Sequence, residues 1–178
     1  MMIFKGWLSV FFALTILLSC QDQNRHELLF ESNNAALSRI HDSLYIVNYT
    51  QKLETDSLIL PYPVFRMDVG DVNEDGQPEI LLGLNKATHF DSVSRNRLFI
   101  YKIYENKIRP LWLGSSIGIP LIDFKTVEMD GKNLVKCLVK DRDTYAVALY
   151  AWRRFGLQFK RFTIEGVRLE KAKRQFNL

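Results

Sequence analysis

Residues 71–79 read Asp71-Val72-Asn73-Glu74-Asp75-Gly76-Gln77-Pro78-Glu79, and an apolar stretch lies on each side of them. The stretches Val64–Val69 and Ile80–Leu84 have the length and composition of strands. The sequence therefore predicts a strand, a tight loop and a second strand. Loop positions 1, 3, 5 and 9 carry side-chain oxygens, Gly76 at position 6 permits a sharp turn, and position 7 offers a backbone carbonyl. Such an alternation of oxygen ligands suits Ca²⁺, since the carboxylates would otherwise repel one another.

Two other loop types share some of these residues. An EF-hand has a bidentate Glu at position 12 and helices on both sides, whereas position 12 here is Leu82 and both flanks are strand-like. A plain Asn/Asp-Gly turn without metal stays open as the alternative, because such a turn needs only residues that tolerate a left-handed backbone. If Ca²⁺ binds, the missing ligand at position 12 predicts a weak affinity of about 10⁻⁴–10⁻³ M and a structural role.

The N-terminus has the features of an export signal. Lys5 precedes the run Leu8–Leu18, which is apolar except for Ser9 and Thr15 and is too short to span a bilayer as a helix. The run ends in Leu17-Leu18-Ser19-Cys20, which resembles the lipobox of bacterial lipoproteins. The resemblance implies that residues 1–19 are removed and that Cys20 carries the lipid, in a family whose anchors include palmitate. An ordinary signal peptide cleaved after Ser19 and a buried N-terminal helix are the alternatives.

The residue after the lipidated Cys bears on location. Gln21 is not the Asp that resembles an inner-membrane retention signal, so an outer-membrane anchor is expected if the cell is Gram-negative. Orientation toward the periplasm or the exterior stays open. Removal of residues 1–19 takes away one Lys and no acid, which leaves 23 basic against 20 acidic residues. Apart from Cys20 the chain then has only Cys137, in an apolar stretch that predicts a buried thiol and no intrachain disulfide.

The rest of the chain is predicted to be all-β. Residues 20–41 are polar with scattered apolar residues and are expected to be a tether with a short helix or irregular segment. Strands are predicted at Leu44–Tyr49, Arg97–Tyr104 and Tyr145–Trp152, and the last two each lead through a turn into a second strand. We therefore expect a β domain over residues 42–166 and a basic C-terminal tail over residues 167–178.

A weak internal repeat accompanies these strands. Ser43–Tyr49 aligns with Arg97–Ile103, and Leu98–Tyr104 resembles Ala146–Trp152. Pro63–Asp68 likewise matches Pro120–Lys125. A unit of about 50 residues with four short strands has the span of one propeller blade. The predicted fold class is thus all-β, with two propeller-blade-like antiparallel repeats plus an N-terminal hairpin, in a partial-propeller or sandwich-like arrangement.

The segment Phe65–Leu84 resembles the FG-GAP/VCBS repeats of integrin-α-type propellers, which carry a calcium loop between two strands. The resemblance implies that Asp71, Asn73, Asp75 and Glu79 ligate Ca²⁺ by side chain and that Gln77 does so by backbone oxygen. The second copy of the repeat keeps the Asp130-Gly131 turn but lacks the flanking ligands, so one site is expected. Because closed propellers have 4–8 blades, this chain would be an open partial propeller, a sandwich-like pair of sheets, or a fragment completed by another chain.

Two function classes remain. The sequence has no catalytic constellation, which favours a non-enzymatic, lipid-anchored calcium-binding module for binding or assembly in the bacterial envelope, with a protein or polysaccharide partner and an oligomeric state left open. Export argues against nucleic acid as a partner, although the C-terminal stretch is basic with interleaved Phe. The alternative is an envelope polysaccharide hydrolase that draws paired carboxylates from Asp68, Asp91, Asp123 and Glu128.

Overall fold

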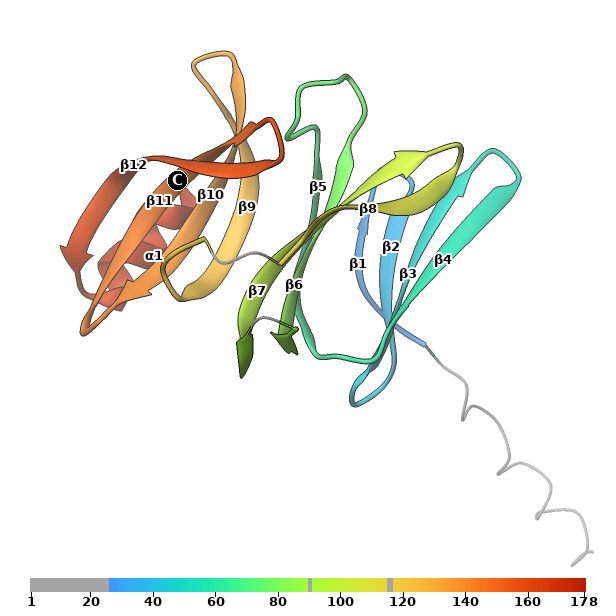
Figure 1. Cartoon of the computed structure of the whole chain (residues 1–178), viewed down its shortest axis with the longest axis horizontal. Helices are drawn as coiled ribbons and strands as arrows, with labels where there is room; N and C mark the ends of the chain where they lie inside the picture. Colours follow the sequence, from blue (N-terminus) through green and yellow to red (C-terminus); the bar gives the residue numbers. More distant parts are fainter. Residues whose placement is uncertain (1–25, 90, 115–116) are drawn as a thin grey trace, which may run out of the picture.

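The protein consists of three four-stranded antiparallel sheets and one short helix. The computed structural model describes residues 26–89, 91–114 and 117–178. In each sheet the strands follow chain order, so that every strand pairs with its neighbours in sequence. The sheets lie one after another along the long axis of the molecule, and the helix lies against the third sheet (Figure 1).

Sheet 1 contains β1 (Glu27–Ser32), β2 (Ala35–His41), β3 (Leu44–Gln51) and β4 (Glu54–Leu60). Sheet 2 contains β5 (Val64–Gly70), β6 (Glu79–Thr88), β7 (Asp91–Tyr104) and β8 (Lys107–Leu113). Sheet 3 contains β9 (Leu121–Met129), β10 (Lys132–Asp141), β11 (Thr144–Arg153) and β12 (Gly156–Val167). Helix α1 is Leu169–Asn177.

The burial pattern of each strand reflects the place of its sheet in the stack. Sheet 2 lies between the other two, and all six residues from Glu79 to Leu84 of β6 are buried. The central strands of sheet 3 are likewise buried on both faces, because sheet 2 covers one face and α1 the other. In sheet 1 only one face packs inward, so burial alternates along β3, with Tyr45 and Val47 buried and their neighbours partly exposed.

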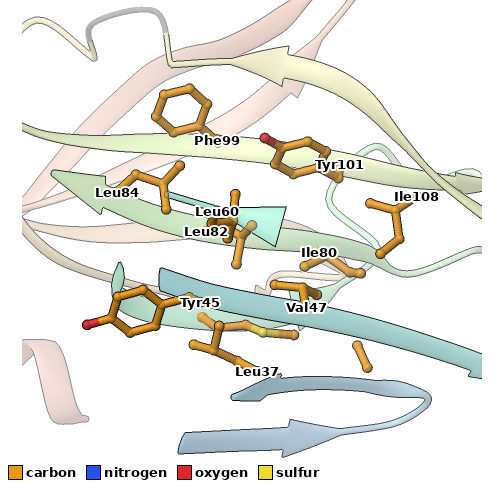
Figure 2. Packing of buried hydrophobic residues seen from close by; sticks show 12 residues of the cluster. Leu37, Tyr45, Val47, Leu60, Ile80, Leu82, Leu84, Phe99, Tyr101 and Ile108 are labelled. Atoms are coloured by element: carbon orange, nitrogen blue, oxygen red, sulfur yellow. The ribbon is translucent and has the colours of Figure 1, made fainter. Parts of the chain in front are cut away.

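The hydrophobic core is divided among the interfaces between these layers. Between sheets 1 and 2, Leu37, Val47 and Leu60 pack against Ile80 and Leu82, with aromatic rings at the border (Figure 2). Between sheets 2 and 3 the core contains Phe124, Tyr150 and the predicted buried thiol of Cys137, whose pKa burial raises. Trp112 and Trp152 are partly buried against the same cluster. Beneath α1, Ala172 and Phe176 bury against Leu138 and Val147.

The prediction of an all-β fold is confirmed. The predicted number of units, two repeats plus an N-terminal hairpin, is wrong, because the chain forms three four-stranded sheets. Residues 27–41, expected to be tether, form β1 and β2, because Ala35 and Leu37 alternate with less buried residues and pack against sheet 2. The β domain therefore starts before residue 42. Most of the predicted basic C-terminal tail, residues 167–178, is an ordered helix, Leu169–Asn177, with Ala172 and Phe176 one turn apart on its buried face.

The internal repeat matches the topology. The aligned segments around residues 43–49, 97–104 and 146–152 lie in β3, β7 and β11, which are the third strands of the three sheets. The segments that start at Pro63 and Pro120 lead into β5 and β9, the first strands of sheets 2 and 3. The repeat thus identified equivalent strands. The predicted number of units is one too low, because the apolar runs of β1 and β2 are short and lie in a polar stretch.

Candidate functional site

The loop 71–79 connects β5 to β6 and is anchored at both ends. Val72 and Glu79 are each only 1% exposed, whereas the five residues from Glu74 to Pro78 are exposed. Glu74 and Gly76 adopt left-handed backbone angles, with φ of 62° and 86°. Glycine suits the second position, where a side chain would be strained. The buried ends thus hold a strand-flanked turn at the surface, as the sequence predicted.

The side-chain oxygens of the loop turn inward onto its own backbone. Asp71 accepts hydrogen bonds from the backbone N–H of Asp75 at 3.1 Å and of Gly76 at 2.9 Å. The N–H of Asp75 is shared with Asn73 Oδ1 at 2.9 Å, and Asn73 Nδ2 donates to Asp75 Oδ2 at 2.9 Å. Asp75 Oδ1 in turn accepts from the N–H of Gln77 at 2.9 Å. Residues 71, 73 and 75 therefore share one hydrogen-bonded interior.

Glu79 is the most unusual acid of the loop. Its Oε2 accepts a hydrogen bond from the backbone N–H of Val72 at 2.9 Å. The pKa of Glu79 is raised from 4.5 to about 7, mainly by burial and also by the negative charges of Asp75 and Asp71, while the N–H groups of Val72 and Asn73 oppose the shift. Desolvation and like charge both disfavour an ionised carboxylate. A cation close to this carboxyl group would lower its pKa and stabilise its charge.

The donor set of the loop suits a hard cation, but its carboxylates do not form a metal site by themselves. Three carboxylates and one carboxamide supply the oxygen ligands that Ca²⁺ prefers. Within the described ranges, no Lys, Arg or His side chain forms an ion pair with Asp71, Asp75 or Glu79. Across the same ranges, no group of three or more His, Cys, Asp or Glu side chains is arranged to hold a metal. The calcium ligands stay a prediction that also requires Asn73 and the backbone oxygen of Gln77.

On one side the loop is fastened to sheet 3. Glu74 Oε1 accepts a hydrogen bond from the backbone N–H of Asn133 at 3.0 Å. At the end of β5, Asp68 Oδ2 accepts from the N–H of Thr126 at 2.6 Å and from its hydroxyl at 3.0 Å. Gly70 lies so close that an added Cβ would be 2.8 Å from the Thr126 side chain. The loop therefore belongs to the junction between sheets 2 and 3.

On its other side the loop borders a cleft of about 480 Å³ between sheets 1 and 2. Gln77 and Pro78 of the loop line it, together with the β1–β2 turn, the end of β3 and the β7–β8 turn. The sequence did not predict this cleft, because its lining comes from four separate segments. The one feature of the sequence that could have indicated the cleft is the presence of Asn or Gln at each of the turns that line it.

Three of the four acids considered for hydrolysis have separate structural partners. Asp68 is held by Thr126, as described above, and Asp123 lies 3.7 Å from Arg66. Asp91 Oδ2 accepts from Arg97 at 2.6 Å, and this hydrogen bond is the largest cause of its lowered pKa. Glu128 lines a small cleft beside Asp71, whereas Asp123 lines a different cleft next to α1. Structural partners therefore account for Asp68, Asp91 and Asp123 without a catalytic pairing.

Comparison with protein-family models, with curated proteins and with solved structures found no match. The predicted signal peptide and Cys20 lie outside the described residues. In the described part of the chain, no helix has both the length and the apolar character needed to cross a membrane.

Proposed function

We propose that this chain is a non-catalytic, calcium-stabilised β module that serves binding or assembly in the bacterial envelope, where a lipid at Cys20 anchors it to the outer membrane. The observation that carries the proposal is the loop 71–79. It gathers oxygen ligands at alternate positions between two strands and includes a buried glutamate that has no cationic partner among the described residues. A divalent ion at this loop would neutralise the charges that raise the pKa of Glu79.

The arrangement of the sheets supports a partial propeller of three blade-like units. The first strands of the sheets adjoin, since β1 contacts β5 and β5 contacts β9 (Figure 1). Each sheet is a meander in chain order, as in a propeller blade. Three units are fewer than a closed ring requires. Helix α1 covers the outer face of the third sheet, so no further sheet can pack on that face. The surfaces left for binding in this arrangement are the turns and the clefts between sheets.

Calcium binding can be tested on the full-length chain in detergent by thermal unfolding and by isothermal titration calorimetry. The expected result is a higher melting temperature in millimolar Ca²⁺ than in EGTA, since a ligand that binds only the folded state stabilises it. The variant Asp75→Asn should lose most of this stabilisation. A matched control is Asp130→Asn, which alters the Asp-Gly turn that lacks the flanking ligands. An unchanged melting temperature of the wild type would refute the calcium part of the proposal.

The anchor is tested separately. Mass spectrometry of the mature protein should find Cys20 at the N-terminus with attached acyl chains, and Cys20→Ser should release the protein from the membrane fraction. A mature N-terminus at another residue would refute the lipoprotein assignment and leave the calcium proposal unaffected. No specific contact favours the hydrolase alternative, because Asp68, Asp91 and Asp123 each have a separate structural partner.

A further inference from the structure

The cleft between sheets 1 and 2 has an unusual lining for a surface groove. Its rim carries five carboxamide side chains from separate segments, together with one tyrosine: Asn33, Asn34, Gln51, Gln77, Asn106 and Tyr49. We propose that this cleft binds a neutral saccharide of one or two sugar rings. The inference rests on the proposed function in one respect, because Gln77 and Pro78 belong to the candidate calcium loop.

The charge of the lining selects a neutral ligand. Glu105 is the one charged residue among the described residues that line the cleft, and none of them is basic. An anionic ligand would therefore find no counter-charge there. Each carboxamide offers both a hydrogen-bond donor and an acceptor, which matches hydroxyl groups that also donate and accept. A ligand with many hydroxyl groups uses this lining better than an ion does.

The floor of the cleft supplies the apolar part of such a site. Val69, Ile80 and Ile103 line it at the edge of the core between sheets 1 and 2, and the ring of Tyr49 stands beside them. Ligand sites combine apolar walls with a few directed polar groups and have volumes of about 300–1,000 Å³, a range that includes the 480 Å³ found here. The C–H face of a sugar ring can pack on this floor while its hydroxyl groups meet the amides.

The rim of the cleft is held in place by contacts between the two sheets. Asn106 Nδ2 donates to Glu54 Oε2 at 2.9 Å, which leaves the carbonyl oxygen of Asn106 as an acceptor. The N–H of Ile108 donates to Asp56 at 2.8 Å and fixes the same β7–β8 turn to β4. The β1–β2 turn is tied by the N–H of Thr50, which donates to the carbonyl of Asn34 at 2.8 Å. A preorganised rim loses little entropy when a ligand binds.

Turn formation explains some of these amides but not all of them. Asn33 and Asn106 have φ of 51° and 58°, a left-handed conformation that Asn tolerates well. Gln51 and Gln77 do not have a left-handed backbone, so turn geometry does not explain why these positions carry glutamine. Within the described ranges the side chains of Asn34 and Gln77 form no hydrogen bond with protein, so both remain available for a ligand.

The same geometry predicts coupling between the saccharide and Ca²⁺. Gln77 lies between Gly76 and Glu79, and its N–H already bonds to Asp75. An ion at the loop would restrict the backbone at Gln77 and so hold its side chain in the rim. Saccharide affinity is therefore expected to be higher in Ca²⁺ than in EGTA, and by linkage the saccharide strengthens Ca²⁺ binding.

The experiment uses the full chain in a detergent without sugar headgroups. Saturation-transfer NMR is run against glucose, galactose, mannose, N-acetylglucosamine and their disaccharides, with glucuronic acid, glucosamine and an Asn-rich peptide as comparison probes. Binding constants for the best neutral sugar are then measured for wild type, Asn34→Ala and Gln77→Ala. Both side chains are exposed, so the fold is retained. The matched control is Gln158→Ala, an exposed glutamine on β12, away from the cleft.

We expect a neutral sugar to bind, each cleft variant to weaken its affinity by about five-fold, and the control to bind like wild type. The inference is overturned if no neutral sugar binds, if only charged sugars or the peptide bind, or if the cleft variants bind like the control. Stabilisation by calcium without sugar binding would refute the saccharide site and leave the proposed calcium loop intact. Sugar binding without any effect of Ca²⁺ on the affinity would support the cleft and refute the coupling between the cleft and the loop.

Discussion

Glu79→Gln provides a direct test of the electrostatics of the loop 71–79. The carboxyl group is buried, it accepts one hydrogen bond from the N–H of Val72, and its pKa is raised from 4.5 to about 7. Glutamine keeps the shape and an acceptor oxygen but never carries the charge. The substitution therefore removes the cost of ionising a desolvated group beside Asp75 and Asp71.

The magnitude follows from the two pKa values. Between pH 5 and pH 8 the folded wild type releases a proton that the unfolded chain has mostly lost already, so the folded state becomes less stable as pH rises. A pKa of about 7 against 4.5 makes this loss about 2.5 kcal/mol in the free energy of unfolding, and less if water reaches the carboxyl group. At pH 5 the wild type and Glu79→Gln should have similar stability, and in chelator at pH 8 the variant should be more stable.

Urea unfolding at pH 5 and pH 8 in EGTA measures this difference, and a ¹³C NMR titration of the Glu79 carboxyl group gives its pKa independently. Repeating the pH 8 measurement in millimolar Ca²⁺ should reduce the difference, because the wild type gains stability from ion binding that the variant partly loses. Glu74→Gln in the exposed part of the same loop is the control, with a change within about 0.5 kcal/mol at both pH values.

A difference in stability between wild type and Glu79→Gln that is equal at pH 5 and pH 8 would contradict this account. So would a Glu79 pKa close to 4.5 in the absence of calcium. Either result would mean that the carboxylate is solvated in the folded protein and that the loop needs no cation to balance it.

Three further substitutions test the packing. Asp68→Ala should destabilise the protein by about 2 kcal/mol in urea unfolding, because the N–H and hydroxyl of Thr126 lose their acceptor at the junction of sheets 2 and 3; an effect below 0.5 kcal/mol would contradict this. Gly83→Ala should cost about 2 kcal/mol, since its Cβ would lie 2.5 Å from the Phe65 ring, and adding Phe65→Leu should recover part of the loss. Phe176→Ala should cost about 3 kcal/mol and reduce the helical circular dichroism signal, whereas the exposed Lys173→Ala should change neither.

Strands with clear alternation or long apolar runs could be predicted from the sequence. β3, β7, β8 and β11 are visible there because aromatic and β-branched residues gather in them and turn residues separate them. The strand-flanked loop 71–79 and the buried Cys137 were also predictable, since both depend on local composition. The repeat located the third strand of every sheet.

Elements that rely on a few long-range contacts were missed. β1 and β2 look like part of a tether because their apolar runs, Leu28–Phe30 and Ala35–Leu37, are short and lie in a polar stretch, and they become a sheet by packing on sheet 2. Helix α1 lies in a strongly basic stretch, where two buried residues, Ala172 and Phe176, fix it to sheet 3. In both segments the few apolar residues lie among many polar and charged ones, so local hydrophobicity alone does not indicate a strand or a helix.

The sequence by itself determined which residues of the loop carry side-chain oxygens at alternate positions and which strands repeat, because both depend on neighbours along the chain. Only the tertiary structure decided that Glu79 is buried, that sheet 2 is covered on both faces, and that Asn33, Gln77 and Asn106 meet at one cleft. The physical reason is that burial and convergence arise from packing between sheets, which brings together residues up to 73 positions apart.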